Sequence, residues 1–268
     1  MSAQHRKKPP ACAIVLSAGQ GRRLLPLTAE QPKCLIRIGD RTLLEWQVDA
    51  LLEAGIREVV VISGYRSDLV EGVIKKRYGH RRVRVEFNPF FDISDNLASC
   101  WIARDVMSDD FLLLNGDIIF EAAVLNRVLE SETAPITLTV NLKDEYDDDD
   151  MKVKVNRGLV RQVSKTLAPQ QTDCESIGML YFRGKGPALF RAAVENAMRH
   201  PTSLKLWYLS IIDALAADGV VRPCPVTGLG WAELDFPGDL EAAKAAFGGI
   251  TVGTKLIVKR KRKVKSKK

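Results

Sequence analysis

Short apolar runs alternate with amphipathic stretches along the first half of the chain. The runs predict buried strands of four or five residues at Ala13–Leu16, Val59–Ile62, Val83–Phe87 and Phe111–Leu114. After the first two runs, apolar residues recur at helical spacing, at Leu44, Val48, Leu51 and Leu52 and then at Leu69, Val70, Val73, Ile74 and Tyr78. Apolar strands joined by helices are typical of a parallel sheet covered on both faces. We therefore expect an α/β fold with a Rossmann-like, three-layer α/β/α arrangement around a mostly parallel sheet.

A different pattern begins at Pro135. Apolar and polar residues alternate in Ile136–Leu142, Met151–Val155 and Leu159–Val163, and Asn156-Arg157-Gly158 joins the last two as a hairpin turn. We expect these half-exposed antiparallel strands to form a small lobe beside the parallel sheet. Helical spacing returns in Pro187–Met198, in about Leu204–Asp218 and after Pro237. The sequence thus predicts one folded domain over residues 11–248, with a sheet part at about 11–134 and a lobe part at about 135–248.

The cysteines and the lengths of the apolar runs indicate the cellular compartment in which the protein is expected. Five cysteines are scattered without a C-x-x-C pair, which favours a reducing environment and argues against a zinc site. No apolar run approaches the roughly 20 residues that span a bilayer, and the first ten residues contain no apolar signal segment. We expect a cytoplasmic protein without a transmembrane segment.

The formal net charge of +7 arises at the two ends of the chain. Residues 255–268 contain nine Lys or Arg and no acid, and residues 6–8 add three more, so the remainder is net negative. Segments so highly charged cannot bury enough apolar surface to fold, and we expect residues 1–10 and 249–268 to be disordered. The C-terminal tail either contacts an anionic surface, such as nucleic acid or lipid, or only keeps the chain in solution.

The first predicted strand leads into a turn of small residues, Ser17-Ala18-Gly19-Gln20-Gly21. Small residues let backbone N–H groups approach an anion closely, and such groups favour phosphate. Arg22, Arg23 and Lys33 add positive charge beside the turn, as a triphosphate site requires. A Gly-x-Gly pair alone has little specificity, because it lacks the third glycine of the dinucleotide fingerprint and the Gly-Lys-Ser/Thr ending of a P-loop.

The longer string around this turn is much more specific. Its spacing, Gly19-x-Gly21-x-Arg23-Leu24-x-Pro26-Leu27-Thr28-x3-Pro32-Lys33-x-Leu35, resembles the signature of the nucleotidyltransferases that activate sugar phosphates and related alcohol phosphates. The resemblance implies that this segment wraps a nucleoside triphosphate. The residues it implies at the nucleotide are Leu16, Ala18, Gly19, Gly21, Arg22, Arg23 and Lys33, although Arg22 stands where the family usually has Thr or Ser. It also implies that residues 11–134 bind the nucleotide and residues 135–248 the acceptor.

Two acidic segments are candidates for a metal site. Asp117 follows the predicted strand Phe111–Leu114, where it either holds Mg²⁺ or caps the next helix. Further on, Glu233 and Asp235 point to the same side of a strand, and their charges repel each other unless a cation lies between them. The resemblance implies that Asp117 and Asp235 together bind Mg²⁺, with Glu233 in support. Capping of the last helix is the alternative for Asp235.

The loop Asn88–Ser99 is rich in turn residues and leads into a helix near Leu97. In the resembling family this loop contacts the base and part of the acceptor. The resemblance therefore implies nucleotide-binding roles for Asn88, Asp95, Asn96 and Ser99. Helix capping by Ser94 or Asn96 is the alternative.

The acceptor candidates lie in the lobe part. Lys152 resembles the lysine with which phosphocholine-type members bind the acceptor phosphate, and Lys154 lies on the same face of the strand. Glu175 and Gly178, just before a predicted strand at Met179–Phe182, resemble an element that lines the acceptor pocket. The segment Asp144–Asp150 holds six acids in seven positions. It is either a solvated loop or part of the acceptor site, where it suits a cationic head group such as choline or aminoethyl.

Taken together, the resemblance implies an enzyme that transfers a nucleotidyl group to a small phosphorylated or phosphonylated alcohol and releases pyrophosphate. The acceptor phosphate is itself a nucleophile, so catalysis consists of alignment and charge neutralisation at the α-phosphate. Lys33, Arg23 and Asp117 are the expected catalytic residues, with Mg²⁺ as cofactor.

The identity of the nucleotide rests on shorter strings. Asn96–Ser99, Asp150–Val153 and Trp231–Pro237 resemble the cytidylyltransferases for phosphocholine, aminoethylphosphonate and inositol phosphate, which makes CTP the expected donor. A sugar-1-phosphate enzyme that uses UTP, dTTP or GTP is the alternative. Two further alternatives are a non-catalytic, nucleotide-binding regulatory relative and a protein that binds nucleic acid through its basic tail. A homo-oligomer is compatible with the sequence.

Overall fold

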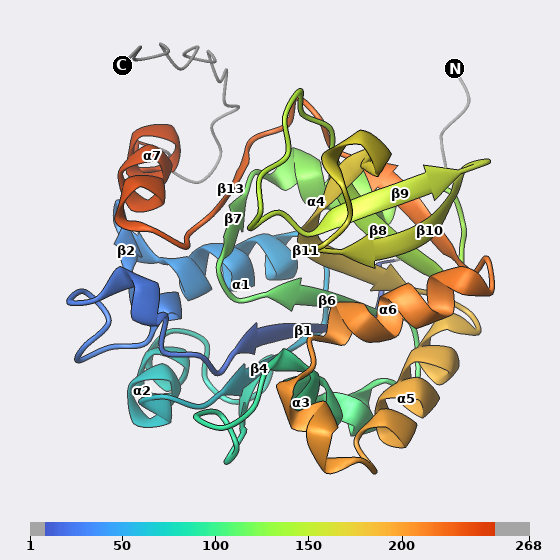
Figure 1. Cartoon of the computed structure of the whole chain (residues 1–268). Helices are drawn as coiled ribbons and strands as arrows, with labels where there is room; N and C mark the ends of the chain where they lie inside the picture. Colours follow the sequence, from blue (N-terminus) through green and yellow to red (C-terminus); the bar gives the residue numbers. More distant parts are fainter. Residues whose placement is uncertain (1–8, 250–268) are drawn as a thin grey trace, which may run out of the picture.

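The computed structural model describes residues 9–249, so the ends expected to be disordered lie almost wholly outside it. A mixed sheet of nine strands forms the centre of this part (Figure 1). Its main path has the order β10-β9-β11-β6-β1-β4-β5, and β8 and β12 join it through β11. The strands are β1 (Cys12–Ser17), β4 (Glu58–Ser63), β5 (Val83–Phe87), β6 (Phe111–Asn115), β8 (Ile136–Asn141), β9 (Lys152–Asn156), β10 (Leu159–Ser164), β11 (Cys174–Phe182) and β12 (Val221–Pro225).

β1 lies at the centre of the parallel half, between β4 and β6, and all six of its residues are buried. Its first five residues are apolar because helices cover both faces of the sheet. Ile14 and Leu16 face a core shared with α3, α5 and α6, whereas Ala13 and Val15 face a core shared with α1, α2 and α4. These helices are α1 (Leu43–Glu53), α2 (Ser67–Arg77), α3 (Asn96–Ile102), α4 (Ala122–Leu129), α5 (Gly186–Ala197) and α6 (Tyr208–Ala217). The predicted three-layer α/β fold is confirmed.

β11 joins the antiparallel strands to the parallel half. It pairs with β6 over Met179–Phe182 and with β9 at Cys174 and Glu175. β9 and β10 form the predicted hairpin, whose turn has positive φ at Arg157 and Gly158, as tight two-residue turns require. The antiparallel strands are therefore present as predicted, but they extend the central sheet and do not form a separate one.

Three local predictions are wrong. The half-exposed strand predicted at 136–142 is buried from Ile136 to Val140, since Arg183 lies at its polar face and donates to Thr137 Oγ1 at 2.6 Å. The helix predicted from Leu204 begins at Tyr208, because a separate 3₁₀ turn, Pro201–Lys205, ends in extended backbone. The segment Glu175–Gly178 lies inside β11 and not before it.

Small elements complete the edge at which the parallel strands end. β7 (Ile118–Phe120) pairs with β13 (Trp231–Glu233), and β2 (Arg37–Ile38) pairs with β3 (Arg41–Thr42). α7 (Pro237–Phe247) packs against these pairs in a third apolar cluster. Within residues 9–249, no helix has the length and apolarity to cross a bilayer. Ligands of such sheets bind at the carboxyl ends of the strands, which directs attention to this edge.

Candidate active site

The turn after β1 brings Lys33 to the strand ends. Gly21 has a φ of 79°, and a Cβ on it would lie 2.7 Å from the Cβ of Lys33. Gln20 O accepts a hydrogen bond from the backbone N–H of Lys33 at 3.3 Å, and Gly21 O accepts one from Thr28 Oγ1 at 2.9 Å. Only glycine fits both the backbone conformation and the close approach. The turn therefore fixes the start of the Lys33 side chain beside β1.

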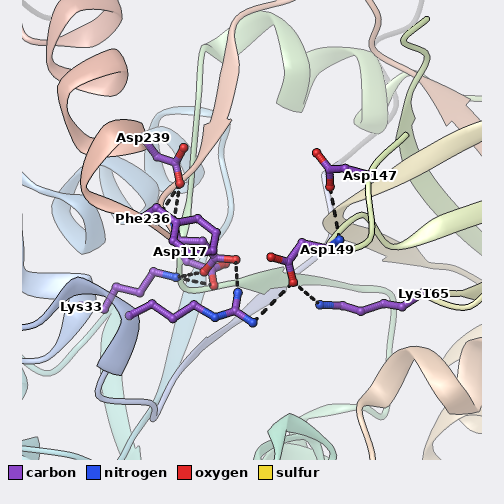
Figure 2. A network of polar contacts seen from close by, with 9 residues as sticks. Lys33, Asp117, Asp147, Asp149, Lys165, Phe236 and Asp239 are labelled. Atoms are coloured by element: carbon purple, nitrogen blue, oxygen red, sulfur yellow. Dashed lines mark hydrogen bonds and ion pairs between the residues drawn. The ribbon is translucent and has the colours of Figure 1, made fainter. Parts of the chain in front are cut away.

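Lys33 extends toward two carboxylates from distant parts of the chain, one of which is Asp117 (Figure 2). Its Nζ lies 3.0 Å from Asp117 Oδ2 and 2.7 Å from Asp235 Oδ1. β13 and β7 bring these carboxylates together, and Leu234 N donates to Asp117 O at 2.9 Å. Burial opposes the charged form of Lys33, but the two carboxylates outweigh burial and raise the pKa of its ammonium group. Lys33 is therefore a fixed positive charge at neutral pH.

Glu233 joins these carboxylates. Asp117, Glu233 and Asp235 each offer an oxygen, and the three oxygens lie within 4.8 Å of one another. Asp117 Oδ1 is buried and has no hydrogen-bond partner within residues 9–249. Glu233 is exposed at the surface of the site, but the surrounding protein still removes part of the water around its carboxyl. This desolvation and the charges of Asp117 and Asp235 raise the pKa of the carboxyl to about 8. An unpaired buried oxygen beside two further carboxylates fits Mg²⁺, which prefers oxygen ligands.

A chain of ion pairs leads from this cluster into the acidic loop. Arg23 lies 3.3 Å from Asp235 Oδ2 and 3.5 Å from Asp149 Oδ1. Lys165 lies 3.5 Å from the same oxygen of Asp149, which it approaches from the side opposite Lys33 (Figure 2). The sequence analysis missed Lys165. Its position two residues after the predicted strand Leu159–Val163 is the signal that could have found it.

The first of two adjoining cavities, of about 190 Å³, lies at the ends of β1 and β6. Its lining includes seven of the residues predicted to bind the nucleotide, namely Leu16, Ala18, Gly19, Asn88, Asp95, Asn96 and Ser99. Asn88 Nδ2 donates to Ser99 Oγ at 3.1 Å, and Phe90 N donates to Asn88 Oδ1 at 2.9 Å. The polar groups of Asn88 are therefore already paired, and they hold the loop in shape.

Arg22 lines a neighbouring hollow and not this cavity. Its Nη2 lies 2.6 Å from Asp92 Oδ1, and both side chains are more than half exposed. The pair links the glycine turn to the loop between β5 and α3. A phosphate contact of Arg22 stays a prediction.

The second cavity, of about 220 Å³, lies between the carboxylate cluster and the acidic loop. It shares three residues with the first, and its lining comprises Arg23, Asn96, Asn115, Asp117, Asp149, Asp150, Met151, Lys165, Glu175, Ser176, Gly178, Trp207, Leu209, Glu233 and Asp235. The lining includes the predicted acceptor residues Glu175 and Gly178 but not Lys152. Lys152 is 2% exposed, and its Nζ donates to the backbone oxygen of Lys165 at 2.9 Å. The structure thus brings the side chain of Lys165, and not that of Lys152, to the cavity.

Glu175 anchors the acidic loop to this cavity wall. Its carboxylate lies 2.8 Å from Lys143 Nζ and accepts a hydrogen bond from Asn141 Nδ2 at 2.8 Å. Lys143 also lies 2.6 Å from Asp150. Burial raises the pKa of the Glu175 carboxyl in spite of Lys143. One lysine therefore bridges two carboxylates and ties the loop to β11.

The layered sheet carries the glycine turn and the carboxylate cluster together at its strand ends. Residues 12–150, more than half of the chain, match the family model for nucleotidyl transferases. The chain belongs to the nucleotidyl transferase family.

Comparison with individual proteins gives more detail. The chain is similar to the CMP-5'-(3-aminopropyl)phosphonate synthase of Streptomyces rubellomurinus, with 28% identity over 258 residues that cover 89% of this chain and 39% of that protein. It is similar to a mannose-1-phosphate guanyltransferase of Aspergillus fumigatus, with 34% identity over 110 residues that cover 40% of this chain and 30% of that protein. The chain thus spans well under half the length of either relative. Among solved structures, a CTP:phosphocholine cytidylyltransferase of Streptococcus pneumoniae matches with a TM-score of 0.76 at 19% identity, over 88% of this chain and 99% of that one. This last likeness shows the fold.

Proposed function

We propose that this chain is a Mg²⁺-dependent cytidylyltransferase that transfers CMP from CTP to a small phosphorylated or phosphonylated alcohol and releases pyrophosphate. The observation that carries the proposal is the cluster of Lys33, Asp117, Glu233 and Asp235 where the two cavities meet. Asp117 lines both cavities. A reaction between two phosphate-bearing substrates needs its charged groups at such a junction.

In this proposal the triphosphate lies along the glycine turn, and the acceptor phosphate enters between Arg23 and Lys165. An oxygen of the acceptor phosphate attacks the α-phosphorus as the bond to the pyrophosphate oxygen breaks, so no protein nucleophile is needed. Lys33 donates hydrogen bonds to the α-phosphate oxygens, where negative charge increases. Arg23 holds and orients the phosphates.

Asp117 and Asp235, with Glu233 in support, are the residues that hold Mg²⁺ in this proposal. Asp117 Oδ1 supports this role because it is buried without a partner within the described chain. The bound ion supplies positive charge that neutralises the phosphate oxygens.

CTP is the favoured nucleotide because a similarity that covers 89% of the chain is to a CMP-5'-(3-aminopropyl)phosphonate synthase. A sugar-1-phosphate enzyme that uses GTP, UTP or dTTP is the second candidate, and the similarity to a guanyltransferase favours it. The retained Lys33 and carboxylate cluster argue against a non-catalytic relative. We also propose a cytoplasmic location, which suits the five free and buried cysteines.

The test is release of pyrophosphate with Mg²⁺, measured for CTP, UTP, dTTP, ATP and GTP against phosphocholine, aminoethylphosphonate, inositol 1-phosphate and glucose 1-phosphate. We expect a signal with CTP and one of the first three acceptors. A signal with UTP, dTTP or GTP and glucose 1-phosphate would assign the chain to the sugar branch. No signal in the whole grid, with CTP still bound, would contradict the proposal for these acceptors and favour a non-catalytic relative.

A further inference from the structure

One carboxylate of the acidic loop stands between two cations that come from different parts of the chain. Asp149 Oδ1 lies 3.5 Å from Arg23 Nη2 and 3.5 Å from Lys165 Nζ. Figure 2 shows Asp149 in this bridging position. Its side chain is half exposed, so the two contacts are weak ion pairs that an incoming anion can replace.

The other acids of the loop have different surroundings. Asp150 is held by Lys143, and it accepts a hydrogen bond from Asp147 N at 2.7 Å. Asp147 Oδ1 in turn accepts one from Asp149 N at 3.2 Å. Asp148 is exposed and has no ion pair within residues 9–249. The loop therefore keeps the backbone of Asp149 in place while its carboxylate remains exchangeable.

An acceptor phosphate needs the same two cations. When its oxygens take Arg23 and Lys165, Asp149 loses its partners but stays at the cavity wall, because the backbone contact with Asp147 and the Lys143–Asp150 ion pair still hold the loop. A carboxylate without a partner beside a phosphate repels it. This repulsion disfavours an acceptor that carries no charge apart from its phosphate. A positive charge elsewhere on the acceptor cancels the repulsion.

The same cavity also offers an aromatic surface for a cation. Trp207 lines the cavity and is 38% exposed, and Lys165 Nζ already lies 5.0 Å from the centre of its ring. Indole faces attract ammonium groups and tolerate alkyl substituents on them. A carboxylate and an indole that face one cavity form a suitable environment for an organic cation.

We propose that Asp149 is a specificity-determining residue that exchanges Arg23 and Lys165 for an ammonium group of the acceptor, so that the enzyme selects phosphates or phosphonates that also carry a positive charge. This inference rests on the proposed function, since it takes the second cavity as the acceptor site. It adds a charge requirement for the acceptor and assigns that requirement to one residue.

The test uses two acceptors that differ in one atom, phosphocholine and 3,3-dimethylbutyl phosphate, in which carbon replaces the charged nitrogen. Binding of each is measured by calorimetry with the full chain in the presence of Mg²⁺, and turnover with CTP is measured separately. We expect the wild type to bind phosphocholine on the order of tenfold more tightly than the neutral analogue. In Asp149→Asn the ratio should fall to within about twofold, chiefly because the neutral analogue binds better once the repulsion is gone.

The matched control is Asp148→Asn, which removes the same charge from the next position and should leave the ratio unchanged. Equal binding of the two acceptors to the wild type, binding of neither, or an unchanged ratio in Asp149→Asn would overturn the inference. An equal loss of preference in both variants would also overturn it, since the effect would then be general to the loop charge. If the preference depends on Asp149 but pyrophosphate is released with none of the nucleotides, the proposed function fails while the charge selection stands.

Discussion

The two cavities of the site are built from different kinds of interaction. The first cavity, where we propose that the nucleotide binds, is lined by the glycine turn, by Asp95 and Asp117, and by neutral groups that bond to one another, such as Asn88 and Ser99. The acceptor-side cavity is lined by charged side chains whose ion pairs link separate loops, such as Arg23 with Asp149. Exposed ion pairs contribute only about 0–1 kcal/mol, so the acceptor side can exchange partners at little cost. The nucleotide side is preformed, whereas the acceptor side is adjustable.

The largest effect is expected at Asp117, which both cavities share. Asp117→Asn removes a charge from the proposed metal site and should lower kcat by on the order of a thousandfold. Pyrophosphate release under saturating substrates measures the loss. The folded state should remain, because the substitution also relieves repulsion among the three carboxylates. A kcat within tenfold of the wild type would contradict a shared catalytic junction.

On the acceptor side, Lys165→Gln should raise the KM for the acceptor. Loss of a charge-assisted hydrogen bond costs about 1.5–3 kcal/mol, which corresponds to a factor of roughly 10 to 150. The KM for CTP should change little, because Lys165 does not line the first cavity. Arg161→Gln, an exposed position on β10, the strand that precedes Lys165, is the control. Equal changes in both KM values would mean that the two cavities are not independent.

On the nucleotide side, Asn88→Ala should act mainly through stability. Asn88 is 1% exposed, and its loss leaves Ser99 Oγ and Phe90 N without their partner. The free energy of unfolding in urea should fall by about 1–3 kcal/mol. The KM for CTP should rise as the loop loosens, while the KM for the acceptor stays the same. Unchanged stability would mean that this cavity is not preformed by its internal hydrogen bonds.

The smallest effect concerns the metal alone. Mg²⁺ at ten times its dissociation constant should stabilise the fold by about 1.4 kcal/mol, or roughly 3–6 °C in Tm. Thermal unfolding with and without a chelator measures the shift. Asp235→Asn should remove most of the shift, and an exposed substitution such as Asp148→Asn should retain it. Equal shifts in all three proteins would place the ion elsewhere.

The sequence predicted the lining of the first cavity better than that of the second. The strands β1, β4, β5 and β6 are apolar runs with local signals, and parallel strands end at one edge. Asp117 could therefore be placed at that edge from its position after β6. The glycine turn was equally visible, since the close approach at Gly21 involves Lys33, only twelve residues along the chain.

The acceptor side depends on pairings that alternation along one strand cannot reveal. Lys152 and Lys165 are both basic and lie side by side at the open end of one hairpin, and only the pairing of β9 with β10 and β11 decides which is covered. The contact of Arg23 with Asp149 joins residues 126 positions apart. No local signal predicts such a contact, because it follows from the way in which the loop folds over the sheet.

β11 connects the two cavities of the site through its backbone pairing. Its end at Met179–Phe182 pairs with β6 beside Asp117, and its start at Cys174 and Glu175 pairs with β9. Backbone ladders depend little on exposed side chains, so the exposed residues of 143–165 can change while the buried Val153, Val160 and Val163 keep the strands packed and in register. Under the proposed function, acceptor preference and nucleotide chemistry can therefore change separately on one scaffold. A chimera that receives residues 143–165 from a relative would therefore acquire the acceptor preference of that relative and keep its own nucleotide chemistry.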